Sequence, residues 1–164
     1  MTHNTTVRMR ILAAIFLPLA MFLLPSCSDE NDLPDVDIDV TYTGATTVDG
    51  TLYVDQTQPF AISSVVATAV REGHKAGVTN VAYGLDGWVL GVSSNPPFAI
   101  EFDTSTLQTG RHLLTLTMTI AEEGCELATA YYATTIQVVA SPEEIPSTDD
   151  TQGTFHAHPT IQAQ

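Results

Sequence analysis

The stretch VTNVAYGLDGWVLGVSSNPPFAIEFDTSTLQTGRHLLTLTMTI, residues 78–120, contains several strand-like segments and the strongest hairpin signal of the chain. At its end, Leu114, Leu116, Met118 and Ile120 alternate with threonines, which is the period-2 pattern of a strand with one buried face. Asp86-Gly87 is typical of a type I′ hairpin turn, because both central residues of that turn need positive φ. The stretch therefore predicts consecutive strands over residues 78–85, 88–92, 98–102 and 112–120.

Similar segments lie on both sides of this stretch. Residues 51–54 and 60–70 precede it, and residues 126–139 follow it, with Ile136 and Val138 as expected core positions. No segment shows a sustained helical period. About seven short strands, separated by turns about every 8–12 residues, predict an all-β antiparallel β-sandwich.

An alternating acidic segment lies ahead of these strands. Asp35–Val40 is expected to form an edge strand or a solvated linker. A calcium loop of the EF-hand kind is not favoured, because Val40 and Thr46 stand where that loop needs glycine and glutamate.

Three motifs occur in an order that resembles a known family. Asp86-Gly87, Pro97-Phe98 and Leu107-Gln108-Thr109-Gly110-Arg111-His112 follow one another within residues 50–140. This order resembles bacterial Ig-like domains related to fibronectin type III and cadherin modules. The resemblance implies an Ig-like sandwich in which Phe98 fills the core and His112 closes its rim. Such domains share no catalytic residues and serve in spacing, adhesion or ligand binding, so the fold does not settle the function.

The N-terminal residues have the layout of a secretory signal. Arg8 and Arg10 precede the uncharged run 11–24, which is shorter than a transmembrane helix of about 20 residues. Leu24-Pro25-Ser26-Cys27 resembles a bacterial lipobox, although Pro25 departs from the usual small residue. We therefore expect a signal peptide over 1–26, starting at Met1 or Met9, and lipidation, including palmitate, at Cys27. A plain signal peptide with a chance cysteine is the alternative.

The residues after Cys27 turn acidic. Ser28, Asp29 and Glu30 resemble the export signal of Bacteroidota-type surface lipoproteins, which predicts a lipid-anchored protein on the cell surface of the outer membrane. The alternative is an acidic linker on the periplasmic face. We expect an acidic tether over 27–35, the Ig-like domain over 36–140 and a disordered acidic and polar tail over 141–164.

Charge restricts the partners. The chain has a formal net charge of −14, and its 19 acidic residues all follow residue 26, where Arg71, Lys75 and Arg111 are the only lysines or arginines. A surface of this kind repels phosphate backbones, so no nucleic acid partner is expected. The partner through the lipid is the outer membrane, and a protein or glycan ligand remains unnamed.

The residues show little sign of catalysis or of a metal site. Cys125 lies among glutamates that would raise its pKa, so we interpret it as a structural turn residue. His156 and His158 make a poor metal site on a tail expected to be disordered. The sequence predicts no enzyme, no catalytic residues, no metal and no cofactor.

Two aromatic residues are candidates for ligand binding. Trp88 lies beside a hairpin turn, and Tyr131 is adjacent to Tyr132, so one of the two tyrosines must face outward in a strand. The alternative is that Trp88 and one tyrosine belong to the core. The favoured function is a non-catalytic module for adhesion or protein–protein interaction in the cell envelope. The alternative is a glycan-binding lipoprotein of a polysaccharide-uptake system.

Overall fold

The strands of the sandwich form where residues alternate between apolar and polar. A computed structural model describes residues 32–147 and 153–164. Within them the strands are β1 (Val36–Thr43), β2 (Ala45–Val48), β3 (Thr51–Asp55), β4 (Phe60–Ala69), β5 (Ala76–Leu85), β6 (Trp88–Ser93), β7 (Ile100–Phe102), β8 (Gly110–Glu122), β9 (Ala128–Val139), β10 (Thr154–Ala157) and β11 (Thr160–Ala163). Two 3₁₀ turns, η1 (Thr104–Thr106) and η2 (Pro142–Glu144), are the helical elements of this part of the chain.

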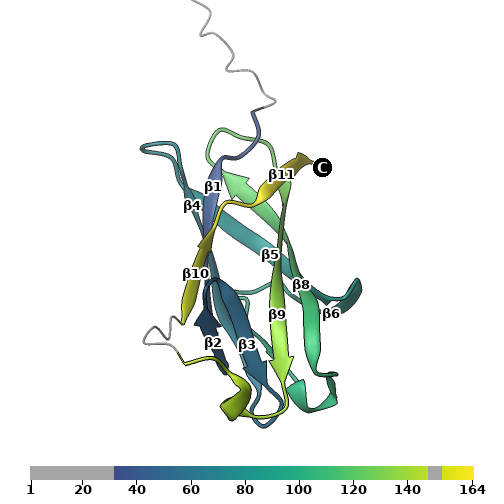
Figure 1. The fold of residues 1–164 in the computed structure, drawn as a ribbon. Helices are drawn as coiled ribbons and strands as arrows, with labels where there is room; N and C mark the ends of the chain where they lie inside the picture. Colours follow the sequence, from purple (N-terminus) through teal and green to yellow (C-terminus); the bar gives the residue numbers. More distant parts are fainter. Residues whose placement is uncertain (1–31, 148–152) are drawn as a thin grey trace, which may run out of the picture.

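The strands form two sheets with an Ig-like order (Figure 1). One sheet has the order β10-β1-β4-β7, and the other has the order β2-β3-β9-β8-β5-β6, with β11 also paired to β9. If β1, β4, β5, β6, β7, β8 and β9 are labelled A, B, C, C′, E, F and G, the sheets read A-B-E and G-F-C-C′. This is the Ig-like β-sandwich arrangement without a D strand. The strand pairings are antiparallel, as predicted, except that of β3 with β9, which is parallel.

The core lies between the two sheets. In β8, Leu114, Leu116, Met118 and Ile120 are buried, as the alternation predicts, and Ile136 and Val138 of β9 are buried as well. Phe98 is also buried, although β7 begins two residues later than expected, at Ile100. Phe60 and Phe102 stack with ring centroids 5.1 Å apart and close the core between β4 and β7.

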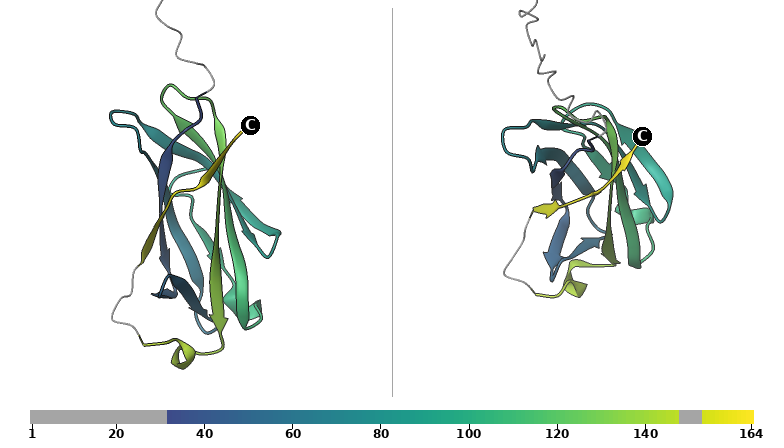
Figure 2. Two further views of the ribbon diagram at one scale, coloured as in Figure 1. Left: turned by 45° about the horizontal axis from the view of Figure 1, so that its top comes forward. Right: turned by 90° about the horizontal axis from the view of Figure 1, so that it is seen from above.

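Within the C-terminal segment, residues 154–157 and 160–163 form strands, which contradicts the prediction of a disordered tail over 141–164 for the described residues. β10 pairs with β1 through Ile38–Ala157 to Thr41–Thr154, and β11 pairs with β9. Figure 2 shows this yellow segment passing from one sheet to the other. Phe155 is half-buried and stacks on Tyr132, with ring centroids 5.3 Å apart. Apolar contacts of this kind offset the entropy of ordering a short polar segment.

The first described residues are held to the end of the sandwich. Arg71 Nη2 donates to the Leu33 carbonyl at 3.0 Å, and Asp35 N–H donates to the Glu122 carboxylate at 2.7 Å. β1 then begins at Val36 and lies between β10 and β4, so it is a strand but not the expected edge strand. The expected signal peptide 1–26, the lipidation site Cys27 and the export signal Ser28, Asp29 and Glu30 lie outside the described residues. Among the described residues, none forms a helix with the length and hydropathy to cross a membrane.

Candidate binding surface

The edge strand β6 exposes an unusual amount of apolar surface. It pairs with β5 and has no second strand neighbour among the described residues. Trp88 is 78% exposed, Val89 73%, Val92 63% and Leu90 48%. Single exposed apolar residues need no explanation, but a contiguous group of them on one strand is typical of an interaction site.

On the outer face of the sheet, side chains of β6 border a shallow depression, the outer trough. Its volume is about 250 Å³. The floor is made of small residues, because Ala82 pairs with Thr117 and Gly84 pairs with Thr115 across β5 and β8. The trough is lined by Ala82, Tyr83, Gly84, Gly87, Trp88, Val89, Leu113, Thr115, Thr117 and Tyr131. The structure therefore places Trp88 and Tyr131, the two residues proposed from the sequence, along one depression.

Glycine keeps the floor of the outer trough open. A Cβ atom on Gly84 would lie 2.5 Å from the Thr115 hydroxyl and 3.2 Å from the Trp88 carbonyl oxygen. A larger residue would therefore push the β6 backbone away from β5 or turn the Thr115 side chain. Tyr131, 42% exposed, lies on the far side of the floor, because it pairs with Thr117.

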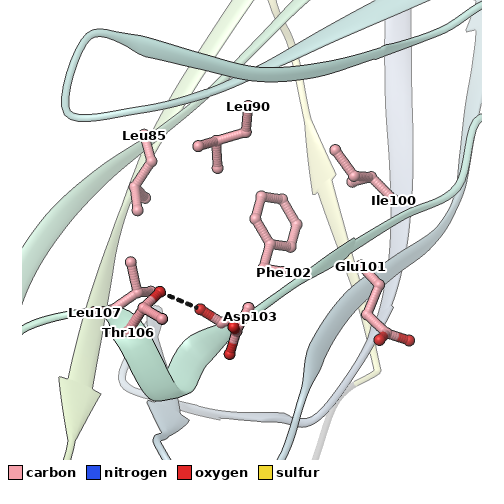
Figure 3. A pocket seen from close by; sticks show the side chains of 8 residues that line it. All are labelled: Leu85, Leu90, Ile100, Glu101, Phe102, Asp103, Thr106 and Leu107. Carbon is pink, nitrogen blue, oxygen red and sulfur yellow. Dashed lines mark hydrogen bonds between the residues drawn. The ribbon is translucent and has the colours of Figure 1, made fainter.

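A second depression, the open-edge pocket, lies between β6 of one sheet and β7 of the other. Its lining residues are Leu85, Leu90, Ile100, Glu101, Phe102, Asp103, Thr106 and Leu107, and its volume is about 250 Å³. Figure 3 shows the apolar side chains of Leu85, Leu90, Phe102 and Leu107 converging on this space. The pocket exists because no strand D closes this edge of the sandwich in the described part of the chain.

The rim of the open-edge pocket is acidic. The Asp103 carboxylate accepts hydrogen bonds from Ser105 N–H at 3.2 Å and from the Ser105 hydroxyl at 2.6 Å, which fixes the start of η1. The exposed Glu101 carboxylate has no hydrogen-bond or ion-pair partner among the described residues. The lining of this pocket contains no lysine or arginine.

An aspartate–histidine pair fixes the turn that leads into β6. Asp86 and Gly87 both have positive φ, 51° and 85°, as the type I′ prediction requires. Asp86 accepts a hydrogen bond from Leu113 N–H at 2.8 Å and contacts His112 Nδ1 at 2.7 Å, while His112 Nε2 lies 2.7 Å from the Gln108 carbonyl oxygen. With a side chain only 13% exposed, His112 closes the rim, as the resemblance implies. The bond to the Asp86 carboxylate raises the pKa of His112.

A buried carboxylate organises the opposite end of the sandwich. The Glu122 side chain is fully buried, and its Oε1 lies 3.2 Å from His74 Nδ1 and 4.0 Å from Arg71 Nε. Arg71 Nη1 also contacts Cys125 Sγ at 3.1 Å. Burial, followed by the charge of Glu122, raises the pKa of the Cys125 thiol, which agrees with the interpretation of Cys125 as a structural residue. These contacts hold residues 32–35 rather than forming a cleft.

The histidines of the C-terminal segment face carboxylates of β1. His156 Nδ1 contacts Asp39, and His158 Nδ1 lies 3.1 Å from Asp37 and its Nε2 3.8 Å from Asp35. Within residues 32–147 and 153–164, no group of three or more histidine, cysteine or acidic side chains could hold a metal ion. Both histidines thus contact carboxylates of β1 and its preceding residue on the surface, beside the strand pairing of β10 with β1.

Sequence reasoning found the aromatic residues of the outer trough but missed the open-edge pocket. That pocket joins residues 85–107 from both sheets, and their proximity depends on β6 and β7 lying in different sheets. The signal available in the sequence was the uncharged segment Trp88–Ser93, in which the alternation of apolar and polar residues fails.

Comparisons with known proteins identify no family. No family model matches the chain, and no curated protein matches it. Among solved structures, the chain is similar to the fibronectin(III)-like modules of Clostridium thermocellum CbhA, with 14% sequence identity and a TM-score of 0.33 over 58% of this chain and 92% of that chain. The Ig-like assignment therefore rests on the strand order and register of the chain itself.

Proposed function

We propose that this chain is a non-catalytic binding module of the bacterial cell envelope, anchored by lipid on Cys27 and displayed on the outer face of the outer membrane by the signal at Ser28, Asp29 and Glu30. It binds a protein partner through β6 and the depressions on either side of it. The observation that carries the proposal is the uncharged, exposed strand β6 on an otherwise acidic chain.

The geometry suits an anchored receptor. Cys27 lies five residues before Asp32, so at about 3.3–3.6 Å per residue the lipid can be no more than about 18 Å from the held end of the sandwich. β5 begins beside Glu122 at that end and runs to Leu85, which pairs with Trp88. At about 3.3 Å per residue, the ten residues of β5 separate Trp88 from the held end of the sandwich by about 30 Å. The binding strand would thus face away from the membrane.

Photo-crosslinking in the cells that produce the protein tests this function. A photoreactive residue replaces Val92 of β6 in one variant and Val66, which is 51% exposed on β4 in the other sheet, in the control. We expect a protein adduct of one defined mass from position 92 and none from position 66. Equal labelling from both positions, or none from position 92, would contradict binding through β6.

The anchor is tested separately. Incorporation of labelled palmitate into the wild-type chain and its loss in Cys27→Ser would support lipidation. External protease that digests the chain on intact cells would support surface display, which should be lost when Asp29 and Glu30 are replaced by asparagine and glutamine.

Glycan binding is the second candidate, and one observation favours it. Trp88 and Tyr131 line the same trough, whose floor of small residues leaves room for a sugar ring to stack on an aromatic face. A glycan array probed with residues 28–164 tests this candidate. These residues contain the whole described core. A glycan signal that disappears in Trp88→Ala at unchanged melting temperature would identify a carbohydrate receptor, and silence on the array would reject this candidate.

A further inference from the structure

β6 differs from the other edges of this sandwich. Proteins protect exposed edge strands by shortness, charge or proline. At the other edges formed by the described residues the strands are short: β7 has three residues, and β2, β10 and β11 have four each. β6 has six residues, WVLGVS, with neither charge nor proline, and it is exposed along most of its length. Its backbone groups on the side away from β5 have no strand partner in this part of the chain.

The two depressions lie on opposite faces of β6. Val89 borders the outer trough, whereas Leu90 borders the open-edge pocket. A strand added beside β6 would alternate in the same way, because successive side chains of a strand point to opposite faces. One set of its side chains would extend the outer face of the sheet, and the other set would lie over the open-edge pocket, where Leu85, Leu90 and Phe102 present an apolar surface.

Charge determines which kind of strand fits. Glu101 and Asp103 both line the pocket on its β7 side, and the Glu101 carboxylate points outward, away from the apolar side chains (Figure 3). A second copy of this chain would bring another body of net charge −14 against this rim. A segment that carries lysine or arginine beside its apolar positions would instead complement the rim.

From these features we infer that β6 binds an extended segment of a partner protein that adds to the sheet as a further strand, with apolar side chains at alternate positions and at least one lysine or arginine near Glu101 and Asp103. The inference rests on the proposed function and names its mode of recognition. Main-chain hydrogen bonds to β6 supply affinity, and the open-edge pocket supplies side-chain specificity.

A random peptide library displayed on phage, panned against residues 28–164, provides the probe. We expect the selected peptides to carry β-branched or other apolar residues at alternate positions together with lysine or arginine. The best peptide is then synthesised with single N-methyl groups along its backbone. Because alternate N–H groups of a strand point toward its neighbour, N-methylation should abolish binding at every second residue and be tolerated between them. Uniform tolerance, or sensitivity without this period, would overturn the inference.

Matched variants locate the binding strand. Val92→Lys should weaken the peptide about tenfold or more, since the new charge repels a basic segment and protects the edge. Val66→Lys, the same substitution at a comparably exposed position on the other sheet, should leave binding unchanged. Glu101→Gln should weaken binding about two- to fivefold, as expected for an exposed ion pair. Glu123 is an exposed residue of the turn between β8 and β9, away from the pocket, and Glu123→Gln should have no effect. Equal effects of Val92→Lys and Val66→Lys, or of Glu101→Gln and Glu123→Gln, would overturn the placement of the peptide beside β6.

The outcomes separate this inference from the proposed function. A crosslinked partner at position 92, combined with peptides that show no alternating N-methyl sensitivity, would reject strand addition while leaving the binding module in place. Dimerisation of residues 28–164 that is lost in Val92→Lys would reject the basic partner in favour of a second copy. Failure of the library to enrich any peptide that depends on β6 would also reject strand addition.

Discussion

Replacing His112 with glutamine should destabilise the domain more at pH 5.5 than at pH 8.5. In the folded chain, the hydrogen bond to Asp86 raises the pKa of His112 above its ordinary value of 6.5. The stabilisation from the protonated pair is therefore fully present below about pH 6.5 and is lost as the pH rises through the folded pKa of His112. The hydrogen bond from the Leu113 N–H is the main cause, and the contact with His112 the second, of an Asp86 pKa below 3.8. In acid, the stabilisation from the Asp86–His112 pair is therefore lost only as the pH falls through this lowered pKa.

The magnitude follows from the contacts of the imidazole. His112→Gln removes a contact to Asp86 and one to the Gln108 carbonyl oxygen. A hydrogen bond to a charged group contributes about 1.5–3 kcal/mol, but the 47% exposure of the Asp86 side chain screens the pair, so we take about 1 kcal/mol for its charge. Adding about 1 kcal/mol for the neutral hydrogen bonds gives a loss of about 2 kcal/mol at pH 5.5 and about 1 kcal/mol at pH 8.5. At about 4 °C per kcal/mol, the melting temperature should fall by about 8 °C and 4 °C respectively.

Urea unfolding of residues 28–164 at the two pH values measures these losses. His156→Gln is the matched control, because its ion pair with Asp39 is exposed and should contribute less than about 1 kcal/mol at either pH. Asp86→Asn should remove the pH dependence that His112→Gln removes. The reasoning is refuted if His112→Gln costs the same free energy at both pH values, since the pair would then stabilise the turn without its charge.

Three further predictions concern the rest of the fold. Gly44→Ala should lower the free energy of unfolding in urea by about 3 kcal/mol or more, because φ is +74° and the new Cβ would lie 2.0 Å from the Pro59 carbonyl oxygen. Gly50→Ala, at φ +75° with no neighbour within 4 Å, should lower it by only about 1 kcal/mol. Equal losses would mean that backbone strain alone accounts for both. Phe155→Ala should lower the unfolding free energy by about 2 kcal/mol and increase amide hydrogen exchange in β10. Unchanged exchange would show that this segment is held without its aromatic contacts. Because burial raises the pKa of its thiol, Cys125 in the folded chain should react with iodoacetamide at pH 7.5 more slowly than a free cysteine, and it should react at the ordinary rate in denaturant. A rate in the folded chain equal to or above that of the free thiol would show that burial does not raise the pKa of Cys125.

The sequence predicts the interior of the sandwich well because burial acts locally on each strand. Alternation identifies the inward residues of β8 and β5, and Asp86-Gly87 identifies the turn between β5 and β6. These features depend on one strand or one turn at a time. The parallel contact of β3 with β9 escapes this reasoning, because the choice of a neighbouring strand depends on residues 84 positions apart, such as Leu52 and Ile136.

The C-terminal segment was predicted wrongly for a related reason. Thr154–Ala157 has one aromatic residue in a polar and proline-containing context, and composition alone is typical of disorder. Its order comes from partners that are remote in sequence, namely Tyr42 and Tyr132 around the Phe155 ring. Two strand pairings and these ring contacts offset an ordering cost that the segment could not offset by itself.

Trp88 shows why the binding surface is harder to predict than the core. In a strand with one buried face, alternation separates exposed from buried positions. β6 is apolar on both faces, so its pattern equally fits a strand that is buried on both faces. Only its place at the edge of the sheet makes these residues accessible.

An exposed apolar edge is also a hazard, because it can pair with the same edge of another copy. The net charge of −14 opposes that encounter, and charges of one sign keep proteins apart in solution. A basic partner meets no such barrier and is attracted instead. The acidity of the chain therefore opposes pairing of β6 with β6 of another copy. The absence of charge on β6 itself leaves this edge able to pair with a strand of a basic partner.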